Sequence, residues 1–444
     1  MSVSPDNASV FFKVLPGETL PIFTGRLDGL TLFYAPGYLA AARETEAEEI
    51  RMILAGEIPF GNLLAANLID AAVSAQSIRA MQQDPEHYRP TCLTVYSSLA
   101  CNLNCSYCFS SGARDAHLQL DAGFIYDSAA GILANCREMD EPFTVVFHGG
   151  GEPSLDPRLP DLLTELQRMS AAADVPFRSY IATNGVMDED KAGWIAENID
   201  AIGLSVDGPP ELQNRQRPLR NGDGSSPFIE RTAAVLRGCG KKLTVRVTIL
   251  PENFRRMGEI AGYLSEILHA DEIHIEPVYE RGSEPDAEFA DLFCENYLNL
   301  KKQMGRRLSF SGSRIGEIHG RYCQIFRQVL HLVPPGGQSA CFALSSREEA
   351  ESNGLLMDEA DTCRLFGLLS AEDPGCKDCF NRYHCAGGCP DVCPALAPKL
   401  RDAGSFRCRI SRKLAEAELL ETAKRSLFGI ARQYGYAGMD LRGE

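Results

Sequence analysis

Between residues 90 and 280, short apolar segments alternate with longer amphipathic stretches. The short segments are rich in β-branched residues and predict strands, whereas stretches such as 159–169 and 229–237 have the spacing of amphipathic helices. Strands that alternate with helices in this way are typical of βα units, whose strands form a parallel sheet. The predicted strands cover residues 93–96, 143–147, 179–182, 201–206, 243–250 and 272–277.

Residues 1–90 have a different pattern. Two apolar runs, 10–15 and 30–34, predict hairpin strands. Thr45 opens a capping-box pattern, which predicts that a helix begins there and ends at the next glycine. A second helix is predicted over residues 63–81.

Composition and charge limit the classes of protein to which this chain can belong. The chain has 444 residues, of which 44% are hydrophobic and 23% charged, so it is expected to fold into two or three domains. The net charge of −16, without a long basic run, argues against nucleic-acid binding. No apolar run is long enough to predict a membrane span, and no secretion signal is recognisable.

The chain contains sixteen cysteines, seven of them between Cys363 and Cys408. Without a secretion signal, such cysteines indicate metal ligands in a reducing compartment rather than disulfides, so we expect a cytoplasmic protein. Four cysteines stand singly in apolar or mixed segments and are expected to be buried thiols: Cys92, Cys136, Cys239 and Cys294.

Three cysteines, Cys101, Cys105 and Cys108, lie close together after the first predicted strand. A cubane iron–sulfur cluster is bound by thiolates, usually four. Three ligands therefore leave one iron free to bind a small molecule. The alternatives are a zinc site that lacks one ligand, or three thiols without a ligand role.

A second pattern follows the second predicted strand, where Gly149, Gly150 and Gly151 precede Glu152 and Pro153. Glycines allow a ligand to approach the backbone closely, and successive N–H and C=O groups can bind it. Glu152 adds an anion that suits an ammonium group. Because glycine-rich strand ends are common, this pattern is informative only together with the cysteine loop.

The cysteine loop and the Gly-Gly-Glu-Pro turn together resemble the radical S-adenosylmethionine (SAM) enzymes. The resemblance implies an α/β fold with a partial (β/α)6 barrel of the TIM type. It also implies that the three cysteines hold a [4Fe–4S] cluster whose open iron chelates the methionine moiety of SAM, while the glycine turn meets its ammonium group. In such barrels, ligand sites gather at the carboxyl ends of the strands, where both motifs are predicted to lie.

Three further residues match the SAM site of that family. Asn184 follows the third predicted strand, and Ser205, on the fourth, is expected near the ribose. Arg217 is the best match for the arginine that meets the carboxylate, although Gln213 and Asn214 stand where the family often has His-Asp. A capped strand end for Ser205 and a solvated charge for Arg217 are the alternatives.

The C-terminal cysteines resemble the SPASM extension of radical SAM enzymes, a twitch-type domain that carries two auxiliary clusters. The resemblance places one cluster on Cys376, Cys379, Cys385 and Cys408, and the other on Cys323, Cys341 and Cys389. The alternatives are one cluster with spare thiols, or a zinc site.

The second auxiliary cluster lacks one ligand, because Glu317 stands where this group of enzymes has a further cysteine. Either the cluster has an open iron, which we favour, or Cys393, Cys363 or His319 is the fourth ligand. An open iron could bind a substrate thiol or amide.

The resemblance implies an enzyme with three [4Fe–4S] clusters and SAM that abstracts a hydrogen atom from a precursor peptide or protein. The product would be a thioether or carbon-linked crosslink, or an oxidised side chain. A flavodoxin- or ferredoxin-type protein would donate electrons. A sulfatase-maturase-like enzyme that forms formylglycine is one alternative, and a non-catalytic iron–sulfur protein for electron transfer or peptide binding is another. Candidates for a catalytic acid or base lie at predicted strand ends: Asp207, Glu276 and Tyr279. A packing or capping role explains each of them equally well.

Three regions are expected. Residues 1–90 resemble the winged-helix modules that bind leader peptides in ribosomal-peptide maturases, residues 91–310 form the radical SAM barrel, and residues 311–444 form the auxiliary-cluster domain with a C-terminal helix. An exposed strand edge in the first region would capture a peptide by β-addition. The alternative is that residues 1–90 are a structural cap on the barrel.

Overall fold

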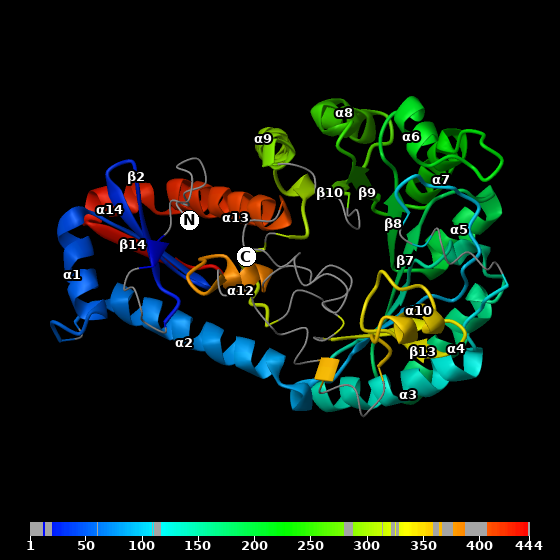
Figure 1. The fold of residues 1–444 in the computed structure, drawn as a ribbon, viewed down its shortest axis with the longest axis horizontal. Coiled ribbons are helices and arrows are strands. Elements are labelled where there is room, and N and C mark those ends of the chain that lie inside the picture. The colour runs from blue at the N-terminus through cyan, green and yellow to red at the C-terminus, as the bar shows by residue number, and fades with distance from the viewer. Residues whose placement is uncertain are drawn as a thin grey trace.

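The computed structural model describes residues 12–13, 20–59, 61–108, 110, 117–278, 287–312, 314–320, 325, 328–357, 364–365, 376–386 and 406–442. Within these residues the chain forms two sheets, one of nine strands and one of five. The two sheets lie at opposite ends of the molecule, and helix α2 (Leu63–Gln83) runs between them along one side (Figure 1). The prediction of this second helix is confirmed.

The nine-stranded sheet is the barrel sheet, with the order β11-β10-β9-β8-β7-β6-β5-β12-β13. Strands β5 to β10 are parallel and stand in chain order. They are β5 (Cys92–Val95), β6 (Phe143–Phe147), β7 (Phe177–Thr183), β8 (Ala201–Ser205), β9 (Thr244–Ile249) and β10 (Glu272–Pro277). Each predicted strand matches one of these, so the expected α/β fold with a partial barrel is confirmed.

Helices separate these strands in the sequence. They are α3 (Ala122–Met139), α4 (Leu159–Ala172), α5 (Glu189–Asn198), α6 (Pro210–Gln216), α7 (Ser226–Gly238), α8 (Met257–Glu266) and α9 (Ala287–Met304). Their apolar faces and alternate residues of the strands form one continuous core. Cys136 on α3 and Cys294 on α9 are buried there, and Cys92 is half-buried, whereas Cys239 is exposed at the end of α7. The prediction of a buried Cys239 is therefore wrong, because its segment is a surface helix terminus.

The opposite face of the barrel sheet is more open. In β6, β9 and β10, buried residues alternate with residues that are partly or largely exposed. Side chains alternate between the two faces of a strand, so one face packs on the helices and the other does not. We call the second face the inner face; the strand register places Val146, Tyr180, Ser205, Arg246 and Glu276 on it.

Short strands extend the barrel sheet at both edges. β11 (Leu308–Ser309) pairs in parallel with β10. β12 (Val329–Val333) pairs in parallel with β5, and β13 (Gly337–Gln338) returns antiparallel to β12. Helix α10 (Arg347–Ser352) follows. Residues after 310 therefore contribute strands to the barrel sheet.

The five-stranded sheet joins the two ends of the chain. Its strands are β1 (Phe12–Lys13), β2 (Phe23–Leu27), β3 (Leu30–Ala35), β4 (Tyr38–Ala42) and β14 (Tyr436–Asp440), in that order and all antiparallel. The predicted runs 10–15 and 30–34 contribute β1 and β3, but β2 lies between them, so they are not partners. The described part of run 10–15 is β1 alone.

Helices cover both faces of this second sheet. Phe33 and Ala40 pack on α1 (Glu44–Leu54) and α2, whereas Leu32 and Ala41 pack on α13 (Phe406–Ser426) and α14 (Phe428–Tyr434). All residues of β3 are therefore buried. The first and last parts of the chain form one hydrophobic unit.

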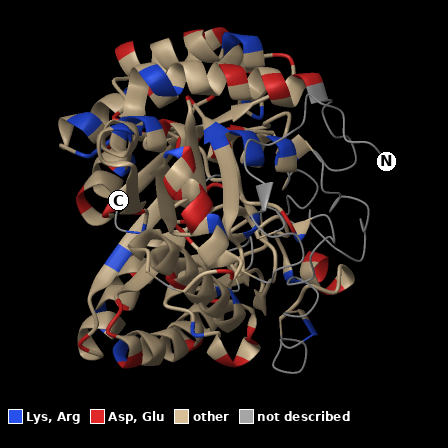
Figure 2. Cartoon of the chain, turned by 90° about the vertical axis from the view of Figure 1, so that its left-hand side faces the viewer, with Lys and Arg blue, Asp and Glu red and all other residues tan. Residues whose placement is uncertain are grey.

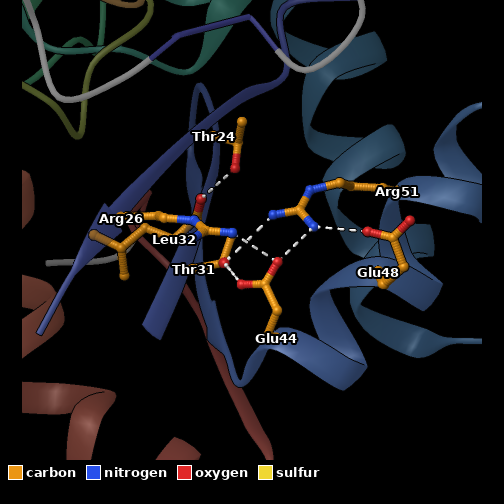
Figure 3. A network of polar contacts seen from close by, with 7 residues as sticks. All are labelled: Thr24, Arg26, Thr31, Leu32, Glu44, Glu48 and Arg51. Carbon is orange, nitrogen blue, oxygen red and sulfur yellow. Dashed lines mark hydrogen bonds and ion pairs between the residues drawn. The ribbon is translucent and has the colours of Figure 1, made fainter. Parts of the chain in front are cut away.

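Helix α1 differs at its start from the predicted capping box. The helix begins before Thr45, and Arg43, the residue ahead of its first turn, makes no capping hydrogen bond through its side chain. The capping-box prediction is wrong because Glu44 is already helical and bonds elsewhere. It accepts from Arg26 of β2 at 2.8 Å, which attaches the helix to the second sheet, and it pairs with Arg51 of the same helix at 3.2 Å (Figure 3).

Along the described elements of the second sheet and its helices, acidic and basic residues are interspersed (Figure 2). Among the described helices, none combines the length and the apolar character needed to cross a membrane.

Candidate active site

The cysteine loop follows β5 and is held by main-chain hydrogen bonds. The amide of Asn104 donates to the carbonyl of Pro218 at 2.8 Å, and the amide of Ser106 donates to the carbonyl of Gln216 at 2.9 Å. The end of α6 and the residues just after it thus fix the loop conformation. Three thiols on this loop are half-buried: Cys101, Cys105 and Cys108.

The glycine turn packs directly against the start of this loop. The amide of Glu152 donates to the carbonyl of Ala100 at 2.7 Å. A Cβ atom on Gly151 would lie 2.2 Å from that carbonyl oxygen, which no side chain tolerates. Cβ atoms on Gly149 and Gly150 would lie 3.0 Å or less from neighbouring side chains. Gly151 is therefore required by contact between the two motifs, and Gly149 and Gly150 leave little room for a side chain.

Glu152 connects the glycine turn to the end of β7. Its side chain is 2% exposed, and its carboxylate accepts from the hydroxyl of Thr183 and the amide of Asn184, both at 2.7 Å. The amide of Ser154 donates to it at 3.1 Å. The contact of Glu152 with an ammonium group stays a prediction, and the structure adds a role in positioning Asn184.

Asn184 lies against the cysteine loop. Its Nδ2 donates to Oδ1 of Asn102 at 2.9 Å and lies 3.8 Å from Sγ of Cys101. Hydrogen bonds to cluster sulfurs are one means by which proteins tune iron–sulfur clusters. The predicted residues 149–152 and Asn184 are thus brought together at Cys101, while Ser205 lies on the inner face of β8.

A buried network lies beside the cysteine loop. The Tyr107 hydroxyl donates to Oδ2 of Asp207 at 2.6 Å and accepts from Nη1 of Arg217 at 2.8 Å. Oδ1 of Asp207 accepts from the amide of Thr248 at 3.1 Å. Sequence reasoning missed Tyr107, although a hydroxyl-bearing ring between two cysteines was a signal. Asp207, considered as a catalytic group, is fully buried and bonded in this network.

The network brings a positive charge close to the thiols. Burial opposes the charge of Arg217, yet Tyr107, Cys105 and Asp207 raise the pKa of its guanidinium well above the usual value. Burial raises the pKa of the Cys105 thiol to about 11, and the charge of Arg217 opposes this rise. Since the thiolate is the form that binds metal, Arg217 favours the binding form.

The donor set fits an iron–sulfur cluster. Within the described residues, no group of three His, Cys, Asp or Glu side chains converges in the way that a single metal ion requires. A cubane does not need such convergence, because each thiolate binds a different iron. Three thiols on one loop, beside the Asn184 amide and the Arg217 guanidinium, suit this ligand.

A second cysteine region contains Cys376, Cys379, Cys385 and Cys408, all half-buried. The first three lie on a turn and on the short helix α12 (Arg382–Cys385), and the fourth lies in the first turn of α13. Burial raises the pKa of Cys379, and the charge of Cys408 adds to the rise, so these two thiols lie within electrostatic reach of each other.

Helix α2 forms one wall of this second region. Arg79 is 5% exposed, and its Nη1 donates to the carbonyls of His319 at 3.3 Å and Arg382 at 3.1 Å. The guanidinium lies 5.3 Å from the ring centre of Tyr383. Gln83 donates to another carbonyl of the 318–320 segment at 3.1 Å. A helix of the second sheet thus fixes the cysteine turn.

Glu317 stands where a further cysteine was expected, and it carries ion pairs. Its carboxylate pairs with Arg314 at 2.9 Å and with His319 at 3.2 Å. The hydrogen bond with His319, followed by Arg314, lowers the pKa of Glu317 to about 2. His384 donates from Nδ1 to the Glu317 carbonyl at 2.7 Å, so its Nε2 accepts from the Tyr34 hydroxyl.

The half-buried Cys341 belongs to a segment that lies near the first cysteine loop. The hydroxyl of Tyr96, at the end of β5, donates to the carbonyl of Phe342 at 2.7 Å. Ser110 and Ser345 share a hydrogen bond of 2.8 Å. Outside the described residues lie Cys323, Cys363, Cys389, Cys393 and Tyr279.

The last strand-end candidate, Glu276, is engaged by its neighbours. Its carboxylate accepts from the amide of Ser311 at 2.7 Å and pairs with His274 at 2.8 Å. Interaction with His274 lowers its pKa against the opposing effect of burial. These contacts attach β10 to the residues after β11.

Comparison with protein families decides the nature of the barrel. The family model of the radical SAM superfamily matches residues 95–264. Residues 95–264 are a radical SAM domain. Members of this superfamily are enzymes that use SAM and a [4Fe–4S] cluster, which agrees with the donor set of the cysteine loop.

Two relatives are similar to this chain over part of its length. A cysteine-type anaerobic sulfatase-maturating enzyme of Clostridium perfringens is 27% identical over 173 residues, 38% of this chain and 47% of that enzyme. A tungsten-containing aldehyde ferredoxin oxidoreductase cofactor-modifying protein of Pyrococcus furiosus is 26% identical over 169 residues, 37% of this chain and 45% of that protein. The chain thus spans about half the length of these relatives.

Solved structures share the fold over a longer stretch. The structure of anSMEcpe with bound AdoMet has a TM-score of 0.57 at 20% identity and covers 75% of this chain and 98% of its own. Streptococcus suis SuiB bound to precursor peptide SuiA has a TM-score of 0.51 at 16% identity, covering 78% and 83%. These neighbours share the fold of this chain over 75% and 78% of its length.

Proposed function

We propose that this chain is a radical SAM maturase that modifies a residue of a ribosomally made peptide or protein. The observation that carries the proposal is the contact of the cysteine loop, the glycine turn and Asn184 at the carboxyl ends of neighbouring strands. When bound, the cluster and SAM supply a 5′-deoxyadenosyl radical, which abstracts a hydrogen atom from the substrate.

Each predicted residue has a role in this proposal. Cys101, Cys105 and Cys108 hold the cluster, and the backbone of residues 149–151 binds the methionine moiety with Glu152, Asn184 and Ser205. Arg217 binds its carboxylate. In support, Nε of Arg217 is buried and has no hydrogen-bond partner among the described residues, so the guanidinium retains a donor for an anion.

The C-terminal cysteines extend the proposal to two auxiliary [4Fe–4S] clusters. The electrostatic interaction of Cys379 with Cys408, and that of Cys376 and Cys385 with the same Arg79 guanidinium, supports the first of them. Cys341 belongs to the second, together with Cys323 and Cys389. These clusters would take the electron that the substrate radical loses. A flavodoxin- or ferredoxin-type donor and a cytoplasmic location complete the proposal.

The substrate class rests on two kinds of neighbour. SuiB is described with its precursor peptide, and anSMEcpe with bound peptides, so a peptide is a reasonable substrate. The product would be a crosslink or an oxidised side chain. Formylglycine formation is a second candidate, because the Clostridium perfringens relative is a sulfatase-maturating enzyme.

The test is a coupled assay under anaerobic conditions. The reconstituted enzyme is incubated with SAM, dithionite and either the peptide encoded beside its gene or the Cp18Cys peptide seen on anSMEcpe. Formation of 5′-deoxyadenosine together with loss of hydrogen and retention of sulfur in the peptide supports crosslinking. Loss of sulfur from the cysteine peptide favours formylglycine. Absence of 5′-deoxyadenosine with every peptide contradicts both functions.

A further inference from the structure

Arg246 places a guanidinium on the inner face of the barrel sheet. It stands in β9 between the buried Val245 and Val247, and its own side chain is exposed. Its strand partners are Ser205 on β8 and His274 on β10. Paired residues of neighbouring strands project from the same face, so Arg246 lies in one row with the residue proposed to meet the ribose.

Tyr180 approaches Arg246 across a glycine. Tyr180 lies on the inner face of β7, and Gly203 lies between them on β8. A Cβ atom on Gly203 would stand 1.9 Å from the Tyr180 hydroxyl and 3.5 Å from Cδ of Arg246. Any side chain at this position would displace the hydroxyl. Because Gly203 has no side chain, the Tyr180 phenol and the Arg246 side chain can both approach this position on the inner face.

The fold does not use these two donors. In the part of the chain that the structure describes, the side chains of Arg246 and Tyr180 make no hydrogen bond or ion pair. Carboxylates on β10 and just after β8 have other partners, because Asp207 accepts from Tyr107, Glu276 accepts from Ser311 and Glu272 pairs with Lys242. An exposed cation without a partner stands out in a chain of net charge −16.

The charge of Arg246 also reaches the residue before the glycine turn. Burial, and after it the charge of Arg246, lowers the pKa of His148 to about 4. His148 is therefore neutral at physiological pH, so it adds no positive charge beside the proposed SAM site. Arg246 therefore presents its guanidinium to a ligand on this part of the inner face.

We propose that Arg246 and Tyr180 form a subsite that binds a carboxylate of the peptide substrate beside the SAM site. The inference rests on the proposed peptide-modifying function. A guanidinium offers parallel N–H donors that match the two oxygens of a carboxylate, and the phenol adds an O–H donor. The subsite would favour peptides with Asp or Glu near the modified residue and would set their register.

The test compares two fluorescein-labelled heptapeptides that differ only in a central Glu or Gln. Their binding to the reconstituted enzyme with SAM is measured by fluorescence anisotropy without reductant. The wild-type enzyme should bind the Glu peptide about tenfold more tightly, the value of one charge-assisted bond pair. Arg246→Met should abolish this preference by weakening the Glu peptide alone, Arg246→Lys should retain part of it, and Tyr180→Phe should reduce it.

Arg178→Met is the matched control. Arg178 is exposed on the same face of β7, two residues before Tyr180 and nearer the amino ends of the strands. Its loss should leave the preference for Glu unchanged. Thermal unfolding of each variant checks the fold, and Arg246→Gln replaces Arg246→Met if that variant is unstable.

Equal affinity of the wild-type enzyme for both peptides would overturn the proposal, and so would a preference that survives loss of Arg246. That result would leave Arg246 and Tyr180 as residues that fill the barrel interior. Uncoupled cleavage of SAM is measured on the same preparations. A wild-type enzyme that cleaves SAM but shows no preference contradicts the subsite alone, whereas an enzyme without cleavage contradicts the proposed function.

Discussion

The two cysteine regions of this chain are held in place by different means. The loop of residues 101–108 is fixed from within the barrel, by main-chain bonds to the end of α6 and the residues just after it, and by the Tyr107 network. The turn of residues 376–385 is fixed by side chains from the second sheet and from helix α2, which packs on it. Arg79 reaches it across 303 positions of the sequence, and Tyr34 reaches it across 350.

This difference bears on the structural role of residues 1–90. They were expected to be either a peptide-binding module or a cap. The structure shows them in one hydrophobic unit with α13 and in contact with the second cysteine region. Any peptide bound by this part of the chain would therefore lie on elements that also support the proposed auxiliary cluster.

The largest expected effect follows from deletion of residues 1–90. The deletion removes β1 to β4 and α2, so it exposes the apolar face of α13 and removes Arg79. We expect the C-terminal cysteine region to lose its iron and its cooperative unfolding, as measured by iron analysis and circular dichroism. A truncated chain that keeps both, and loses only peptide binding, would show instead that residues 1–90 are an independent module.

Gly151→Ala should act on the first region alone. The added Cβ would meet the Ala100 carbonyl oxygen at 2.2 Å, so the two motifs must separate. Overpacking of this kind costs about 1–3 kcal/mol and should also weaken SAM binding, measured by equilibrium dialysis. Gly193→Ala is the control, because nothing lies within 4 Å of its Cβ position on α5. Equal SAM affinity in both variants would contradict the close contact.

Arg79→Met should act on the second region alone. It removes hydrogen bonds to two carbonyls at a buried site, which costs about 1–3 kcal/mol of unfolding free energy. We expect a lower midpoint of urea unfolding and faster proteolysis near residue 380, with uncoupled SAM cleavage retained. The exposed Arg89, whose side chain bonds only to the neighbouring Tyr88 carbonyl among the described residues, provides the control Arg89→Met. Loss of SAM cleavage in Arg79→Met would mean that the two regions are coupled.

The smallest expected effect is a pH-dependent loss of stability when Glu317 is replaced. The ion pairs of Glu317 lower its pKa from 4.5 to about 2 in the folded state. Because the folded-state pKa is depressed, the stability that these pairs contribute is present above pH 4.5 and is lost as the pH falls toward 2. Glu317→Gln should therefore lower the urea midpoint slightly at pH 6 and much less at pH 3. A difference that is independent of pH would contradict the ion pairing.

The barrel could be predicted because its signals are local. Each strand from β5 to β10 is an apolar segment with its own alternation, and each is followed by a helix within the same stretch of sequence. The strands that pair over long distances were missed. β12 joins β5 far along the chain, and β14 joins β4 across almost the whole chain, so neither partner is visible in a local window.

The site residues likewise divide into those that a local motif reveals and those whose role depends on distant partners. The cysteines and glycines are recognisable because they cluster in short motifs. Tyr107 lies inside one such motif, but its role depends on Asp207, 100 positions away. Arg217 was expected to meet a carboxylate, and the structure adds its bond to Tyr107. The part played by Arg79 depends on tertiary packing alone, which no spacing in the sequence reveals.

The central claim is that the loop of residues 101–108 carries a SAM-cleaving cluster. The most direct measurement compares the wild-type chain with the triple variant Cys101→Ala, Cys105→Ala and Cys108→Ala after anaerobic reconstitution, with the exposed Cys239→Ala as control. The account predicts a loss of about four irons per chain and no 5′-deoxyadenosine from the triple variant, while the control behaves as wild type. Undiminished formation of 5′-deoxyadenosine by the triple variant would contradict it.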